Sequence, residues 1–88
     1  MTYAQRDELR KLGLTAAQIQ RIGVFIHRID RLDDRISRTR RGLDRESMIY
    51  PWKNPATRIA AYESEKRMIE RNMDDTIKRF IRDNENSK

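Results

Sequence analysis

Arginine is the residue type in this sequence that is best suited to chemistry with a partner. The chain carries 15 arginines and 5 lysines among 88 residues, and its net charge is +6. A guanidinium presents a flat fork of donors that fits a phosphate or a carboxylate in a bidentate manner, whereas an ammonium acts as a point charge. The basic balance therefore favours an acidic partner, either nucleic acid or an acidic protein surface.

One group of arginines has the spacing of a helix face. Arg28 and Arg35 lie one heptad apart, and the same face of an expected helix also carries Arg21, Arg31 and Arg38. We expect this row to lie opposite the apolar seam described below, where it could follow a phosphate backbone. The alternative is a solvated face, because outward positions of a hairpin are normally charged and Asp34 can pair with Arg38 within the helix.

A second concentration of positive charge lies between residues 35 and 58, where seven basic side chains accompany only two acidic ones. Tyr50 and Trp52 lie among these cations, and Trp52 is the single tryptophan. Basic groups mixed with aromatics are typical of base stacking and of protein–protein hot spots. Alternatively, both rings fold back as a plug over the hairpin end. The expected contact residues are Arg28, Arg31, Arg35, Arg38, Arg41, Arg45, Tyr50, Trp52, Lys53 and Arg58.

Residues for catalysis are scarce. The chain has no cysteine and a single histidine, His27, with no nucleophile or metal-ligand set near it in the sequence. The doublets Asp33–Asp34 and Asp74–Asp75 each point to two faces of a helix, so neither forms a paired acid–base site. No glycine-rich phosphate loop or metal motif occurs. We therefore expect no enzymatic activity, no cofactor and no metal.

Residues 5–24 resemble the helix-turn-helix DNA-binding motif. Gly13 falls in the turn, and the expected apolar positions hold Leu12, Leu14, Ile19 and Ile22. The sequence departs from the motif at Glu8, where an apolar residue is usual, and at Leu9, where a small one is usual. The resemblance implies that a major groove would face Ala16, Ala17, Gln18 and Arg21.

Two stretches with heptad spacing must position these side chains. The first consists of Ile19, Ile22, Ile26, Ile29, Asp33, Ile36 and Arg40. The second consists of Ile59, Tyr62, Lys66, Ile69, Met73, Thr76 and Phe80. When the second stretch is folded back antiparallel, Asp33 comes level with Lys66, and we expect this pair to serve structure by fixing the register. The sequence therefore predicts an all-α fold, an antiparallel helical hairpin.

Local signals set the expected bounds within a single domain of residues 1–88. We predict a short helix over 3–12, packed at the open end of the hairpin through Leu9, Leu12 and Leu14. A long helix over 15–41 begins at a capping box formed by Thr15 and Gln18. A basic and aromatic loop spans 42–54, with a helical turn at 44–49. A second long helix over 55–83 begins at Asn54 and Pro55, before a frayed tail over 84–88.

Leu32 is expected to remain exposed near the middle of the hairpin, which favours a homodimer. The alternative is that Met48 and Ile49 cover it. No apolar run reaches the length of a membrane span, and the N-terminus lacks the apolar segment of a signal peptide. We therefore expect no membrane contact and a cytoplasmic location.

Two functions follow from these features. The first is a small non-enzymatic protein that binds nucleic acid or a nucleoprotein complex through its basic tip and arginine face. The second is a protein-binding adaptor or inhibitor, of the kind found in phages and mobile elements, that docks on an acidic or nucleic-acid-binding surface of a partner. Binding to nucleic acid should weaken steeply as salt increases, whereas docking on one protein should give co-purification of that protein.

Overall fold

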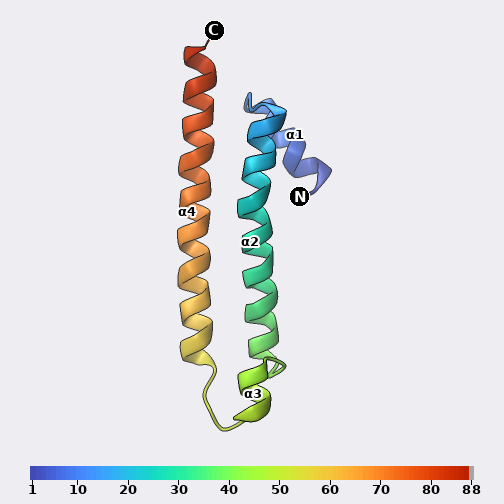
Figure 1. Ribbon diagram of the computed structural model, residues 1–88, viewed down its shortest axis with the longest axis vertical. Helices are drawn as coiled ribbons and strands as arrows, with labels where there is room; N and C mark the ends of the chain where they lie inside the picture. The colour runs from blue at the N-terminus through green and yellow to red at the C-terminus, as the bar shows by residue number, and fades with distance from the viewer. Residues whose placement is uncertain (88) are drawn as a thin grey trace.

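The computed structural model describes residues 1–87 and shows the predicted hairpin (Figure 1). The helices are α1 (Tyr3–Lys11), α2 (Ala16–Arg40), α3 (Arg45–Ile49) and α4 (Ala56–Asn86). The long helices α2 and α4 lie side by side in opposite directions, and α3 sits at the bend between them. The described part of the chain contains no strand and measures 59 × 22 × 14 Å. The prediction of an all-α hairpin is confirmed.

The N-terminus of α2 carries the predicted capping box. The backbone N–H of Gln18 donates to Thr15 Oγ1 over 3.3 Å, and the backbone N–H of Thr15 donates to Gln18 Oε1 over 2.9 Å. The same reciprocal arrangement joins Thr2 and Gln5 at the start of α1, where we did not predict it. Both boxes satisfy donors that a helix start leaves without partners within the helix.

Two glycines end the first two helices by the same mechanism. Gly13 and Gly42 have φ values of +94° and +71°, in the left-handed region that favours glycine. The N–H of Gly13 donates to Arg10 O, and the N–H of Leu14 donates to Leu9 O, which together form a Schellman motif. The motif reverses the chain after α1, so that Leu9 and Leu14 both join the core.

The register of the hairpin is the one that the heptads predict. Lys66 Nζ lies 2.6 Å from Asp33 Oδ1, near the middle of the two long helices. Toward the open end, Ile19 of α2 and Phe80 of α4 belong to one buried cluster. Toward the bend, Arg40 Nη2 donates to Glu63 Oε1 over 2.9 Å. Contacts therefore follow one antiparallel register from one end of the interface to the other.

The main core lies at the open end of the hairpin. Its buried members come from α1, the following turn, α2 and α4, and they are Leu9, Leu14, Ile19, Ile22 and Phe80. Half-buried Phe25, Ile77 and Ile81 pack against them. The predicted packing of the short helix is thus confirmed for Leu9 and Leu14. It is wrong for Leu12, which is 51% exposed because it caps the end of α1 and faces away from this cluster.

Helix α4 is longer than predicted. It continues to Asn86 instead of ending at residue 83, so the prediction of a frayed tail from residue 84 is wrong for 84–86, and Lys88 lies outside the described residues. Asn84 supplies the reason, because its side-chain amide donates to Gly13 O over 2.7 Å and to Gln18 Oε1 over 2.8 Å. The end of α4 is thereby tied to the turn between α1 and α2.

Asn54 and Pro55 lie at the beginning of α4, as predicted, and these two residues play the expected roles. Asn54 Oδ1 accepts a hydrogen bond from the N–H of Ala56 over 3.0 Å, and Pro55 already has a helical backbone conformation. The carbonyl of Pro55 accepts the first helical hydrogen bond, from Ile59. Asn54 thus satisfies a donor in the first turn that the helix itself cannot satisfy.

Leu32 is buried, with 7% of its surface exposed, so the premise of the predicted dimer is wrong. The alternative, in which Met48 and Ile49 cover Leu32, receives no support from their own exposures of 69% and 50%. Leu32 and Ile69 of α4 both line a groove that arginines border. The hairpin therefore buries this leucine without a second subunit.

Candidate functional site

A shallow groove of about 870 Å³ runs beside the interface of α2 and α4 and reaches α3. Its apolar lining residues are Leu32, Leu43 and Ile69. The basic side chains that border it are Arg28, Arg31, Arg35, Arg38 and Arg45. Four of the arginines come from α2 and one from α3, so the groove joins part of the predicted stripe to the basic bend.

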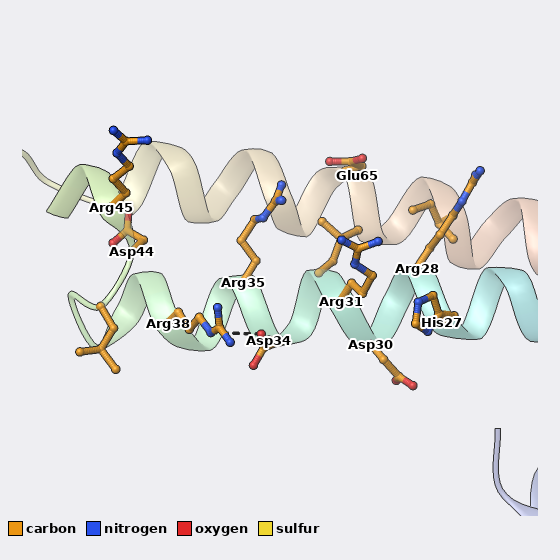
Figure 2. A pocket seen from close by; sticks show the side chains of 13 residues that line it. His27, Arg28, Asp30, Arg31, Asp34, Arg35, Arg38, Asp44, Arg45 and Glu65 are labelled. Atoms are coloured by element: carbon orange, nitrogen blue, oxygen red, sulfur yellow. Dashed lines mark ion pairs between the residues drawn. The ribbon is translucent and has the colours of Figure 1, made fainter. Parts of the chain in front are cut away.

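The arginines of α2 stand along one side of this groove (Figure 2). Arg28, Arg31 and Arg35 rise from successive turns and project toward α4, while Asp30 and Asp34 point away from them. The helix rises about 1.5 Å per residue, so the row spans roughly 10 Å. Short spacing and a shared direction bring three like charges to one strip of surface.

Few of these arginines have an acidic partner within the molecule. Arg38 Nε lies 3.2 Å from Asp34 Oδ2 on the same helix. Among residues 1–87, no carboxylate lies within ion-pair distance of Arg28, Arg31, Arg35 or Arg45. The guanidinium of Arg35 lies over the ring of Tyr62, 5.4 Å from its centroid. The groove thus presents four guanidinium groups without an ion-pair partner in the described part of the chain, although Asp30, Asp34, Asp44 and Glu65 also line it.

The position of the arginine row differs from the prediction. We expected it opposite the apolar seam, but Arg28 and Arg35 border the seam on the side of Leu32, and Arg35 reaches the α4 residue Tyr62. Arg28 directly precedes the seam residue Ile29, and Arg35 directly precedes Ile36. Such positions lie at the edge of the helix interface, and a long arginine side chain can bend from there across the interface. Arg21 of the predicted stripe does not line the groove.

Arg58 is placed differently from the other predicted contact residues. Its side chain is only 17% exposed, and its Nη2 donates to Ser47 Oγ over 2.9 Å and to Asp44 Oδ2 over 3.2 Å. Its Nε lies 3.4 Å from Glu46 Oε2. These contacts join the first turn of α4 to α3. The charge of Arg58 is therefore paired inside the molecule, and its mostly buried side chain is poorly placed to bind a phosphate.

The same cluster changes the titration of Asp44. The hydroxyl of Ser47 and, after it, the positive charge of Arg58 lower the pKa of the Asp44 carboxyl below its usual value, although partial burial opposes this shift. Asp44 therefore stays ionised as the counter-ion of Arg58. Arg45 stands at the same end of the groove (Figure 2), and it forms no ion pair with Asp44.

The aromatic residues of the bend form an exposed pair. The rings of Tyr50 and Trp52 meet edge to face, with centroids 5.6 Å apart and planes at 78°. Lys53 Nζ lies 4.7 Å from the centroid of the Tyr50 ring and 3.4 Å from Glu46 Oε1. Trp52 is 76% exposed and Tyr50 41% exposed. Trp52 therefore does not act as the plug that we considered as an alternative.

The structure also adds residues that sequence reasoning missed. Glu65 lines the groove from α4 (Figure 2), and Leu43 and Ile69 also line it. The heptad of α4 already assigned Ile69 to the seam, but nothing in the sequence placed Leu43, since its position depends on the turn at Gly42. Arg41, which we predicted as a contact, ends α2 and is exposed without lining the groove.

The region that resembles a helix-turn-helix motif is joined to the rest of the fold. Gln18, which the resemblance would place on a major groove, is half-buried and donates through Nε2 to Asn84 Oδ1 over 3.1 Å. Ala16, Ala17 and Arg21 are exposed. Helix α2 also extends over 25 residues, well past the motif, and pairs with α4 over its length.

Among residues 1–87, no group of three or more histidine or carboxylate side chains is arranged to hold a metal ion. The same residues include no helix of the length and apolar character needed to cross a membrane. No protein-family model matches the chain, and neither curated proteins nor solved structures give a match.

Proposed function

We propose that the protein binds nucleic acid through the arginine-bordered groove of α2 and α3. The observation that carries this proposal is that four of the five guanidinium groups lining the groove have no ion-pair partner among the described residues. Arg28, Arg31, Arg35 and Arg45 have no acidic partner within residues 1–87, although acidic residues are close in the sequence. The three arginines of α2 on one strip of surface repel one another, and phosphates would relieve that repulsion.

The internal pairing of Arg58 revises the set of contacts. The proposed phosphate contacts are Arg28, Arg31, Arg35 and Arg45, while Arg38 and Lys53 must first release Asp34 and Glu46. Both of these ion pairs are exposed, so their exchange for a phosphate costs little. Arg58 instead supports the site by fixing α3, which carries Arg45, against the first turn of α4.

Salt dependence of binding tests the proposal. Neutralising four phosphates releases their counter-ions, so the slope of log K against log salt should lie between about −3 for single strands and about −4 for duplex DNA. Raising salt from about 50 to about 200 mM should then weaken binding by about 50- to 150-fold. Binding that does not change over this range would contradict the proposal.

The second candidate function, a protein-binding adaptor or inhibitor, draws support from the bend. Leu43, Met48, Ile49 and Trp52 are all at least 50% exposed there. Aliphatic side chains gain little from phosphates or bases, whereas an apolar pocket on a protein would bury them. The same exposed groups could also join two copies of the chain, although the positive charge of the bend opposes its contact with another copy. Measuring the oligomeric state at low and high salt distinguishes self-association of the chain from docking on a different protein.

A further inference from the structure

We infer that the nucleic acid in this site is single-stranded, with an unpaired base stacked on Trp52. The inference rests on the proposed function and adds the class of nucleic acid to it. It follows from where Trp52 lies, what surrounds the ring, and how the arginine groove leads toward the bend that carries it.

Trp52 offers a free aromatic surface that its neighbours support without covering. The side chain is 76% exposed, although tryptophan is among the residues that gain most from burial. Tyr50 meets it edge to face, at 78°, so this contact does not consist of two stacked ring faces. Lys53 lies over the Tyr50 ring instead of the indole. The arrangement leaves ring surface of Trp52 open for stacking.

The exposed indole at the bend should favour a single strand over an intact duplex. Bases within a duplex already stack on their neighbours and present only their edges in the grooves. An unpaired base has a free face, and stacking of a base on an aromatic side chain tolerates any base. Trp52 would therefore contribute to binding only where bases are unpaired, whereas the arginines would accept phosphates of either form.

The groove ends at α3, and Trp52 follows α3 in the chain on the same bend of the hairpin. Arg28, Arg31 and Arg35 follow α2 toward the bend, and Arg45 stands at the bend end of the groove (Figure 2). Helix α3, which begins at Arg45, ends at Ile49, only a few residues before Trp52. A strand whose phosphates follow the arginines would thus run toward the bend that carries the indole. Sites for single-stranded nucleic acid usually combine basic side chains that follow the phosphate backbone with aromatic side chains on which bases stack.

A comparison of a single-stranded probe with a duplex probe of similar length tests the inference. The probes are a fluorescein-labelled oligothymidine of about 12 nucleotides and a labelled random duplex of about 12 base pairs, followed by anisotropy at one salt concentration. The variants are Trp52→Leu, which removes the ring, Trp52→Phe, which keeps an aromatic face, and Met48→Ala as a control for another exposed apolar side chain at the bend. Circular dichroism confirms that each variant folds, as expected for exposed positions.

We expect the single strand to bind more tightly than the duplex. Trp52→Leu should weaken single-strand binding by about 5- to 150-fold, Trp52→Phe should retain most of it, and Met48→Ala should leave it unchanged. Duplex affinity should be the same for all four proteins. Equal affinity for both probes with no effect of Trp52→Leu would overturn the inference and leave the proposed function standing. Failure to bind either probe would overturn both, and would favour the bend as a contact surface for a protein.

Discussion

Lys66 Nζ of α4 lies 2.6 Å from Asp33 Oδ1 of α2, at the point where each heptad stretch replaces an apolar residue with a charge. The contact with Asp33 is the main reason that the pKa of Lys66 is raised, and the nearby charges of Glu70 and Glu63 add to it. The side chains are 31% exposed for Lys66 and 50% for Asp33, so the pair stands at the edge of the seam. Water screens such a pair, and its role is to favour one register more than to stabilise the fold.

Substitutions of this pair should have unequal effects. We expect Lys66→Leu to keep or raise the melting temperature, because a leucine at this position extends the seam. Asp33→Leu should lower the free energy of unfolding by less than about 1 kcal/mol, because Lys66 keeps Glu63 and Glu70 nearby. Thermal unfolding of both single variants and of the double variant measures this. A larger loss from Lys66→Leu than from Asp33→Leu would contradict it.

Arg58 should matter for stability more than an exposed arginine does. We expect Arg58→Ala to lower the free energy of unfolding by about 1–3 kcal/mol, because Asp44 and Ser47 lose a partner in a mostly buried cluster. The matched control is Arg40→Ala, which breaks the exposed pair with Glu63 and should cost less than about 1 kcal/mol. Urea unfolding compares the two, and equal losses would mean that the cluster does not hold the bend.

The contribution of Asp44 should depend on pH. Its pKa is lower in the folded chain than in the unfolded chain, where an aspartate titrates at about 3.9. Ionised Asp44 therefore stabilises the fold above that value, and the stabilisation is lost as the pH falls through the lower folded pKa. The difference in stability between the wild type and Asp44→Asn should thus be full at neutral pH and shrink below about pH 4. A difference that is constant with pH would rule out this electrostatic role.

Asn84 should anchor the end of α4. Asn84→Ala removes the hydrogen bonds to Gly13 O and Gln18, and we expect a loss of about 1–2 kcal/mol together with faster amide hydrogen exchange over the last turns of α4. Asn86→Ala serves as the control, since Asn86 is an exposed residue of the same helix end. Equal exchange rates in both variants would show that the anchor has no effect.

Two glycines should respond to alanine in opposite directions. Gly42 has φ +71° with open space around it, so Gly42→Ala costs only the left-handed conformation, about 1–2 kcal/mol. Gly23 lies within α2, and a Cβ there would meet only the flexible end of Met1, at 3.2 Å. Gly23→Ala should therefore stabilise by up to about 1 kcal/mol through helix propensity. Unfolding curves of the two variants should shift in opposite directions, and a shift of both in one direction would contradict this reasoning.

Heptad spacing made the fold predictable, because both stretches keep a mainly apolar stripe and place charges of opposite sign, Asp33 and Lys66, level with each other. The local caps were equally readable, since Thr15 and Gln18 satisfy each other within a few residues. Contacts between residues far apart in the sequence could not be predicted. From the sequence, Asn84 belongs to a polar tail. Only the fold shows that the turn at Gly13 lies beside it.

The site was predictable in composition but not in detail. The basic residues are visible in the sequence, yet their pairing depends on side-chain positions. Arg58 looks like any other cation of the bend, and only the placement of α3 shows that Asp44 and Ser47 occupy it. Leu32 looks unpaired on a two-helix seam, yet it is buried in the folded chain and lines the groove that Arg28 and Arg35 border.

The most direct test of the central claim compares two triple variants of equal net charge. One carries Arg28→Gln, Arg31→Gln and Arg35→Gln in the groove. The control carries Arg71→Gln, Arg79→Gln and Arg82→Gln, at exposed positions of α4 that do not line the groove. The measurement is the slope of log K against log salt for a random oligonucleotide.

If the groove arginines neutralise phosphates, the groove variant should lose about 2–3 units of slope and the control should keep the slope of the wild type. Equal loss in both variants would show that only net charge matters, and would contradict the assignment of this groove as the site of contact.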